Sequence, residues 1–292
     1  MKLFLIGTLF LITFLFPAPD FNAIPQKKTT EVNKTPVLVR TTVRRERFRF
    51  PYGGTLTIVG APAGSITIEA WSNPEVDIVA EVQLKADTEL DLDRLAAVNN
   101  LVLDDDANHI RIMTTGTHDK SFMTKIKKFP KNLLGLPWKI DYRIRVPVAT
   151  DVDISAGRGP ITLTGIEGHI QLSAAESDTN LNLSGGTVNA TIAMGKLNLI
   201  VPVKSWRRGG VDIRMAAGDV TVELPPGFAG DLDAEILRSG QIIDSYGSLE
   251  VREKPGITPR MMKARAGAGG TWFRFTVGDG TINIKKTVMS SE

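Results

Sequence analysis

The chain has 292 residues, of which 42% are hydrophobic and 23% charged, a globular composition long enough for one large or two modest domains. It contains no cysteine, which excludes disulfides, thiolate metal sites, cysteine nucleophiles and a lipid-modified N-terminal cysteine. Its 35 Lys and Arg residues nearly balance its 32 Asp and Glu residues, and a net charge of +3 gives no argument for a dedicated nucleic-acid-binding protein.

The chain begins with an apolar segment. Lys2 precedes the uncharged run Leu3–Phe16, of about fourteen residues, which two prolines follow closely. A membrane-spanning helix needs roughly 20 apolar residues, so the run is typical of a signal peptide, with cleavage near Ala18 or Ala23. We therefore predict a signal peptide over residues 1–23 and an exported protein that is periplasmic, on the cell surface or secreted. An uncleaved anchor is the alternative.

Residues 24–50 form a basic segment that we predict to be a linker ending in an edge strand. Arginines crowd its second half, at Arg40, Arg44, Arg45, Arg47 and Arg49. Because apolar side chains alternate with these charges, the pattern indicates a solvated edge strand with outward arginines. Contact with lipid headgroups, anionic glycans or phosphates is the other interpretation.

Residues 51–148 are predicted to be rich in β-strand, because apolar residues alternate with Thr, Asp or Glu in short segments about ten residues apart. Residues 87–100 are the exception. Leu92 and Leu95 fall on one face of a helix there, with Asp87 or Thr88 as its N-cap.

A basic and apolar insertion at residues 120–139 interrupts the strand pattern. Its lysines include Lys125, Lys127, Lys128 and Lys131, and they alternate with Phe, Ile, Leu and Trp residues. One interpretation is a flap that covers an open end of the core. The other is contact with a membrane surface.

A repeat runs through residues 151–227, and each of its units contains two triplets of apolar, polar and apolar residues. The first triplets begin at Val152, Ile170, Val188 and Val211, and the second at Ile161, Leu181, Leu197 and Val220. The two triplets of a unit lie 9, 11, 9 and 9 residues apart. Successive first triplets lie 18, 18 and 23 residues apart, because residues 204–210 are inserted before the last unit.

The repeat predicts an all-β fold in which units stack on one another, since one unit cannot bury its apolar row alone. We expect a right-handed β-helix or similar solenoid of short strands over residues 149–288, with an antiparallel β-sandwich as the alternative. The residues expected to point inward are Val152, Ile154, Ile161, Leu163, Ile170, Leu172, Leu181, Leu183, Val188, Ile192, Leu197, Leu199, Val211, Ile213, Val220 and Val222. The glycines expected at corners with positive φ are Gly157, Gly159, Gly165, Gly168, Gly185, Gly186, Gly195 and Gly218.

Three segments carry a family resemblance: ISAGRGPITLTGIEGHIQLSAAESDTNLNLSGGTVNATI, DVTVELPPGFAGDLDAE and GAGGTWFRFTVGDGTINIKK. Their strand–Gly–strand units, the segment Leu224-Pro225 followed by Phe228, and the closing strand resemble the putative adhesin family of bacterial envelope proteins. That family is similar to autotransporter-type β-helices and related to the toastrack-like domains of envelope-stress regulators. The resemblance covers residues 146–286 well and residues 54–146 loosely. It implies a β-helical envelope protein and specifies no activity.

The sequence shows few signs of catalysis. Its three histidines, His109, His118 and His169, do not have metal-ligand spacing, and no nucleophile elbow or phosphate-binding loop is present. We therefore predict no metal, no cofactor and no nucleic-acid partner. A polysaccharide-cleaving enzyme would need clustered carboxylates, and an outward acidic column is the candidate for them. Its members would be Asp151, Asp153, Asp212 and Asp219.

These observations favour a non-catalytic, exported, adhesin-like envelope protein that is structural or binds a surface. The alternatives are an envelope-stress sensor and a polysaccharide-active enzyme. The two basic clusters favour an anionic glycan or a membrane surface as the partner, with binding expected at Arg44, Arg45, Arg47, Lys125, Lys127, Lys128 and Lys131.

Overall fold

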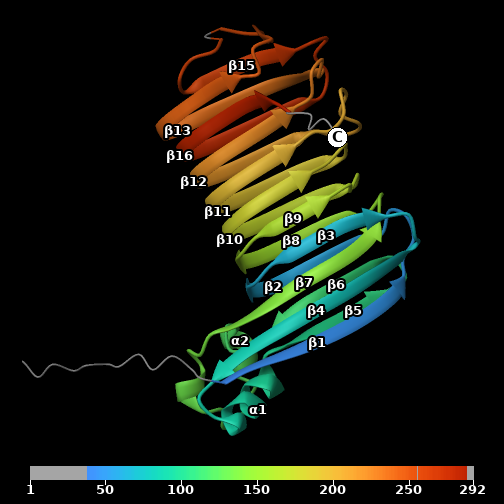
Figure 1. Ribbon diagram of the computed structural model, residues 1–292, viewed down its shortest axis with the longest axis vertical. Coiled ribbons are helices and arrows are strands. Elements are labelled where there is room, and N and C mark those ends of the chain that lie inside the picture. The colour runs from blue at the N-terminus through green and yellow to red at the C-terminus, as the bar shows by residue number, and fades with distance from the viewer. Residues whose placement is uncertain (1–37, 255, 288–292) are drawn as a thin grey trace, which may run out of the picture. The chain divides into compact units, whose positions relative to one another are not determined.

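The computed structural model describes residues 38–254 and 256–287 (Figure 1). The chain divides into two units, Met1–Thr35 and Pro36–Glu292, and every described residue belongs to the second. The predicted signal peptide, and the part of the predicted linker before residue 38, therefore lie outside the described residues.

The unit is all-β, with 65% strand and 7% helix. Its first half contains β1 (Leu38–Arg49), β2 (Thr55–Ala63), β3 (Ile66–Trp71), β4 (Glu75–Ala86), α1 (Glu89–Val98), β5 (Asn100–Asp106), β6 (His109–Thr115), α2 (Lys120–Met123), the 3-10 helix η1 (Lys131–Leu133) and β7 (Trp138–Pro147). Its second half contains β8 (Asp151–Arg158), β9 (Ile161–Thr164), β10 (His169–Asn182), β11 (Thr187–Ile200), β12 (Val211–Leu224), β13 (Gly230–Ser245), β14 (Leu249–Val251), β15 (Met261–Ala266) and β16 (Trp272–Lys286).

All these strands belong to one large, open, mixed sheet. Its main path runs β1-β4-β7-β3-β9-β10-β11-β12-β16-β13-β15-β14. A second row, β5-β6-β2-β8, joins at β10, because the first half of β10 pairs with β8 and its second half with β9. The ladder therefore continues from β2 and β3 into β8 and β9, across the predicted division between residues 51–148 and 149–288.

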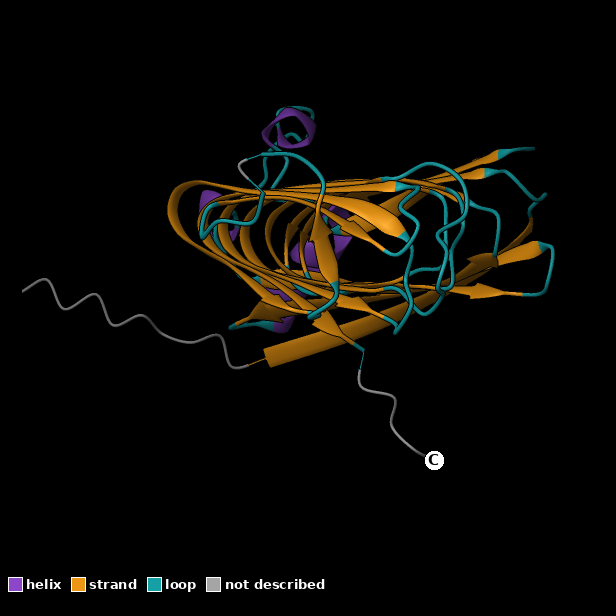
Figure 2. Cartoon of the chain, turned by 90° about the horizontal axis from the view of Figure 1, so that it is seen from above, coloured by secondary structure: helices purple, strands orange, loops and turns teal. Residues whose placement is uncertain are grey.

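Strands β10, β11, β12, β16 and β13 pair in parallel. The pairing stays in register along each long strand, apart from a shift in β13 between Ile236 and Ser239. Seen from above, the long strands bend on one side, so that their two halves run along opposite sides of the unit (Figure 2). Parallel pairing is what stacked units predict, whereas the hairpins of an antiparallel sandwich would pair neighbouring strands in the opposite direction.

Every one of the apolar residues predicted to point inward in the repeat is buried, with at most 1% of its surface exposed. One detail of the prediction is wrong. The second triplet of the second unit begins at Thr179, which pairs with Ile161 and Leu197, rather than at Leu181. Thr179 is buried, and its hydroxyl lies 2.9 Å from the hydroxyl of Ser177. A polar residue in an inward position thus concealed a spacing of nine residues that the four units share.

The bends depend on glycine. Gly195, Gly218, Gly280 and Gly240 have positive φ and occupy the bends of β11, β12, β16 and β13, and Gly159 has positive φ between β8 and β9, whereas Ser177 takes the same position in β10. A Cβ on Gly218 would overlap the backbone carbonyl of Gly195 on the neighbouring strand. Both the backbone conformation and the close approach therefore require glycine here.

Five of the eight glycines predicted at corners have the expected positive φ: Gly159, Gly165, Gly186, Gly195 and Gly218. The expectation is wrong for Gly157, Gly168 and Gly185. A Cβ on any of these would overlap a backbone carbonyl of another segment, so close approach rather than backbone conformation accounts for them.

The N-terminal elements agree in part with the sequence. Strand β1 is at the end of the path and pairs with β4, so it is an edge strand of the sheet. Helix α1 is capped by Thr88, whose hydroxyl accepts a hydrogen bond from the backbone N–H of Asp91 at 3.1 Å. Leu92 and Leu95 are buried on its inner face.

We expect Gly218→Ala to lower the free energy of unfolding by about 3 kcal/mol, because it combines a strained backbone conformation with a steric overlap. Gly247→Ala is the matched control. Gly247 also has positive φ, at 73°, but a Cβ there would have open space around it, so the loss should be only about 1 kcal/mol. Urea unfolding followed by circular dichroism measures both. Equal losses would show that the close approach at the bend does not contribute to the free energy of unfolding.

Candidate functional site

The predicted arginine cluster lies on edge strand β1, and acidic residues neutralise much of it. Nε of Arg47 lies 3.5 Å from Asp77 and 3.9 Å from Glu75, on the neighbouring strand β4. Nε of Arg44 donates to the carboxylate of Glu46 at 2.9 Å. Arg45 is exposed and makes no ion pair among the described residues. These contacts agree with the interpretation of β1 as a solvated edge strand.

The predicted lysine cluster is different. We define the lysine loop as residues 120–137, between β6 and β7, which includes α2 and η1. Lys125, Lys127, Lys128 and Lys131 are all exposed, and none of them pairs with a carboxylate among the described residues. The loop therefore presents four charges that no acidic side chain of the described chain neutralises.

Apolar residues hold the lysine loop against the core. Leu133 is buried in the core, and Phe129, Leu136 and Trp138 pack against it. Both α1 and α2 lie at the β1 end of the unit (Figure 1). These contacts support the flap interpretation. Leu134, by contrast, has 42% of its surface exposed beside the lysines.

The structure brings only Arg40 of the arginine cluster level with the point where the lysine loop rejoins the sheet, since Arg40 and Trp138 both pair with Leu84. The lysine loop returns to the sheet at Trp138, which pairs with Leu84 of β4. Arg47 faces Asp77, seven residues back along the same strand. At about 3.3 Å per residue, the two points are separated by about 23 Å. Arg44, Arg45 and Arg47 are thus not neighbours of the lysine loop where it rejoins the sheet.

The predicted acidic column is also dispersed. Asp153 and Asp212 share a row, but three strand spacings separate them, or about 14 Å. Paired glycosidase carboxyls lie roughly 5–9.5 Å apart. Asp151 accepts a hydrogen bond from the backbone N–H of His169, and Asp219 one from Thr281. Asp212 therefore lies too far from Asp153 to form such a pair with it.

The histidines have local contacts. Nε2 of His109 lies 2.9 Å from the hydroxyl of Thr57. His118 packs on Trp138 with 5.3 Å between ring centroids, and burial lowers its pKa, although Asp119 opposes the change. No group of three or more His, Asp or Glu residues in the described part of the chain could hold a metal ion.

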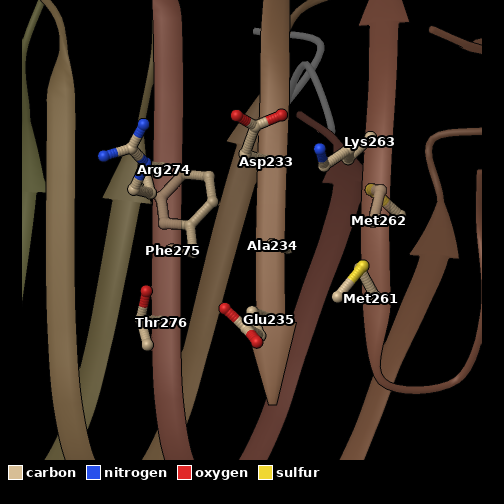
Figure 3. Close-up of a pocket in the computed structure, with 9 residues that line it drawn as sticks. All are labelled: Asp233, Ala234, Glu235, Met261, Met262, Lys263, Arg274, Phe275 and Thr276. Atoms are coloured by element: carbon tan, nitrogen blue, oxygen red, sulfur yellow. The ribbon is translucent and has the colours of Figure 1, made fainter. Parts of the chain in front are cut away.

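A groove that the sequence did not indicate lies near the C-terminal end, across β16, β13 and β15. It has a volume of about 240 Å³, and Figure 3 shows its polar side chains. They are Asp233, Glu235, Lys263, Arg274 and Thr276, with Met261 at one side. Alternation within each strand could have indicated outward residues, but it could not indicate that β15 pairs with β13.

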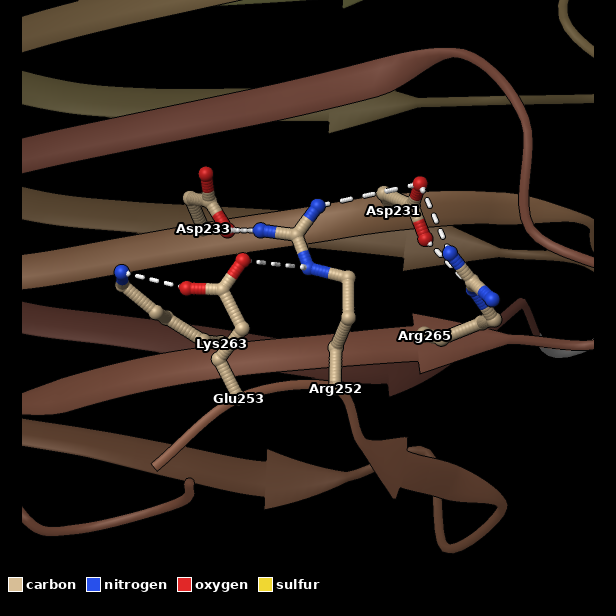
Figure 4. A network of polar contacts seen from close by, with 6 residues as sticks. All are labelled: Asp231, Asp233, Arg252, Glu253, Lys263 and Arg265. Carbon is tan, nitrogen blue, oxygen red and sulfur yellow. Dashed lines mark hydrogen bonds and ion pairs between the residues drawn. The ribbon is translucent and has the colours of Figure 1, made fainter. Parts of the chain in front are cut away.

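An ion-pair network adjoins this groove (Figure 4). Arg252 lies between two aspartates of β13, with Nη2 2.5 Å from Asp233 and Nη1 3.7 Å from Asp231. Arg265 also pairs with Asp231, at 2.8 Å. The Arg265 hydrogen bond lowers the pKa of Asp231, and this outweighs the opposing effect of burial. The network fastens β15 and the segment after β14 to β13.

Among the described residues, no helix has the length and hydrophobicity needed to cross a membrane.

Comparison with known proteins gave structural matches only. No family model matches the chain, and no curated protein matches it. It is similar to the crystal structure of a putative cell adhesion protein from Clostridium sporogenes, with 13% identity and a TM-score of 0.44 over 84% of this chain and 100% of that one. A putative adhesin from Bacteroides fragilis has 12% identity and a TM-score of 0.32 over 83% and 97%. A putative lipid binding protein from Parabacteroides distasonis has 9% identity and a TM-score of 0.25 over 84% and 97%.

The lowered pKa of Asp231 predicts a pH dependence of stability. A carboxyl whose pKa is lower in the folded than in the unfolded protein contributes stability above the unfolded pKa of about 3.9, and this is lost as pH falls through the folded pKa. We expect Asp231→Asn to reduce the free energy of unfolding at pH 7 by up to about 1 kcal/mol, the upper range for ion pairs open to solvent.

The difference between Asp231→Asn and the original protein should disappear as the pH falls below about 4, as measured by urea unfolding at a series of pH values. Asp153→Asn is the control, because Asp153 is exposed and makes no ion pair among the described residues. A loss at Asp231 that is independent of pH would contradict the electrostatic explanation.

Proposed function

We propose that this chain is a non-catalytic, exported envelope protein, with a solenoid-like, adhesin-type stack of strands, that attaches to an anionic surface through its lysine loop. The observation that carries the proposal is the contrast between its two basic clusters. Three of the five arginines of β1, Arg40, Arg44 and Arg47, pair with carboxylates, whereas none of Lys125, Lys127, Lys128 and Lys131 has such a partner in the described chain. Charges without partners are the ones available to an external anion.

The chemistry of the lysine loop favours an anionic lipid surface as the partner. Its lysines surround an exposed apolar side chain, Leu134, and the half-buried Phe122 and Ile126. A basic segment with apolar residues can place these side chains at the headgroup boundary while the lysines remain among the lipid phosphates. Each basic residue near such a surface contributes roughly 1 kcal/mol. Four lysines therefore suffice for reversible attachment.

The stacked strands suit a role as a rigid support. The in-register parallel pairing of β10, β11 and β12 supports the solenoid-like interpretation, and the buried Leu133 holds the lysine loop against the core. The partners of Asp151, Asp212 and Asp219 support the non-catalytic part of the proposal, because each carboxylate already accepts a hydrogen bond within the sheet.

We expect the purified protein to sediment with vesicles that contain phosphatidylglycerol and not with purely zwitterionic vesicles. Binding should weaken as the salt concentration rises towards 0.15 M, where the Debye length is about 8 Å. Replacement of Lys125, Lys127, Lys128 and Lys131 by Ser should abolish the sedimentation without a change in the circular dichroism spectrum.

The matched control replaces four exposed lysines elsewhere, at Lys196, Lys204, Lys254 and Lys286, by Ser. It makes the same change in net charge but leaves the lysine loop intact, so it should bind vesicles nearly as well as the original protein. Equal losses in the two variants would contradict a local site. Turnover of a polysaccharide by the purified protein would instead favour the enzymatic alternative.

Export is tested separately. We expect protein recovered from the cell envelope to have lost its N-terminal apolar run, since the short segment Leu3–Phe16 is typical of a cleaved signal peptide. N-terminal sequencing of the recovered protein measures this. Intact protein that begins at Met1 in the cytoplasmic fraction would refute export.

A further inference from the structure

Trp272 is placed differently from the other tryptophans. Trp206 is buried, and Trp71 and Trp138 are half-buried, whereas Trp272 has 43% of its surface exposed at the start of β16. Its ring lies on Gly210, which precedes β12, and a Cβ on Gly210 would overlap that ring. One side of the indole is thus held against backbone while much of the ring remains open to solvent.

The inserted residues 204–210 create this arrangement. They bring Trp206 into the core, where its indole N–H donates to the carbonyl of Gly186 at 2.9 Å and its ring meets Phe273 edge-on. Because Trp206 anchors the insertion, Gly210, just before β12, lies against one face of the Trp272 ring.

One cation without an ion-pair partner lies beside the exposed ring. Arg274, two residues along β16 on the same face, has its Cζ 5.7 Å from the centroid of the Trp272 ring. It is exposed and makes no ion pair within the described chain. An external carboxylate could take a bidentate position on such a guanidinium.

The acidic residues beside Arg274 already have cations. In the register of the sheet, Arg274 lies between Asp212 of β12 and Asp233 of β13. Asp212 pairs with Arg214 at 2.8 Å, and Asp233 pairs with Arg252 at 2.5 Å. Figure 3 shows Arg274 and Asp233 on the same face of the neighbouring strands. The groove has one other carboxylate, that of Glu235, which lies on β13, the strand next to that of Arg274.

Asp212 also contains an acceptor without a donor. Its Oδ2 pairs with Arg214, but its Oδ1 is buried and has no hydrogen-bond partner. It lines a second groove of about 210 Å³ on the same face, together with the amides of Gln171 and Asn189.

We infer that Trp272 and Arg274 form a binding site for an acidic polysaccharide of the uronic-acid class. The C–H face of a pyranose ring would cover the exposed side of Trp272, and burial of apolar surface favours this contact. The carboxylate of the sugar would pair with Arg274. Repeated sugars along a chain would continue over the amides of the adjoining groove.

A saccharide fits these groups better than a nucleic acid. The phosphates of a nucleic acid carry only acceptor oxygens, which cannot donate to the carboxylates of Asp212, Asp231 and Asp233 in the rows beside Trp272 and Arg274. Hydroxyl groups, in contrast, can donate to such carboxylates. This site is separate from the lysine loop and does not depend on attachment to lipid.

The test measures binding of polygalacturonate to the full chain by calorimetry and by tryptophan fluorescence, with its methyl-esterified form as the uncharged ligand. We expect binding of the acid form, and at least tenfold weaker binding of the ester, because the ester cannot pair with Arg274. Trp272→Ala and Arg274→Gln should each weaken binding by about tenfold or more.

Arg158→Gln is the control, because Arg158 is also exposed but pairs with Glu176 at the bend. It should bind as the original protein does. Both Trp272 and Arg274 are exposed, and thermal unfolding will verify that each variant is folded. Full affinity in a folded Trp272→Ala or Arg274→Gln variant, equal binding of acid and ester, or tighter binding of a single-stranded DNA oligonucleotide would each overturn the proposal.

The variant with Ser at Lys125, Lys127, Lys128 and Lys131 distinguishes this site from the lysine loop. It should lose binding to anionic vesicles and retain binding to polygalacturonate. Loss of polygalacturonate binding in this variant, with Trp272→Ala unaffected, would assign the polysaccharide to the lysine loop and overturn the site at Trp272.

Discussion

The structure depends on the close approach of backbones where its long strands bend. At this point the carbonyl of one strand lies against the Cα of the glycine on the next, as Gly195 does against Gly218. A side chain at either position would push the strands apart. The two halves of each strand would then lose the register that places apolar residues one above another. The stacked core is therefore a consequence of backbone contact at the bend as well as of hydrophobic burial.

In-register stacking has an effect on the surface too. Where inward residues align in columns, the outward residues between them must align as well, so Thr162, Asn180, Asn198 and Thr221 form a continuous polar row. Such rows are flat and open, and their grooves are shallow. This surface suits extended ligands and membranes, which need repeated weak contacts, better than it suits a small substrate that must be enclosed.

The two proposed binding sites both arise where an insertion interrupts this regular stack. The lysine loop separates β6 from β7, and residues 204–210 separate β11 from β12. Each insertion buries an aromatic or aliphatic anchor, Leu133 in one and Trp206 in the other. The anchor fixes the insertion, and this leaves its polar residues facing solvent. Binding groups can thus be added to the repeat without a change to the core, because each insertion brings its own apolar contact.

Much of the fold could be predicted from the sequence, because alternation of apolar and polar residues reports directly which side chains face inward. The inward residues from Val152 to Val222 and the strand β1 were predicted in this way. The chemistry of capping side chains left Asp87 and Thr88 as candidates for the helix cap, and the structure has Thr88. The failure at Thr179 has the same origin. Alternation detects apolar residues, and a buried hydroxyl satisfied by Ser177 leaves no such signal.

What the sequence alone determined is therefore local: which residues are buried, where the chain turns, and that two segments are basic. Only the tertiary structure decided which charges are neutralised, because Asp77 reaches Arg47 from another strand. It also decided that Asp212 and Arg274, 62 residues apart, are neighbours on one face. Pairing between distant strands depends on register and direction, and no local pattern contains these, since every outward row has the same period of two.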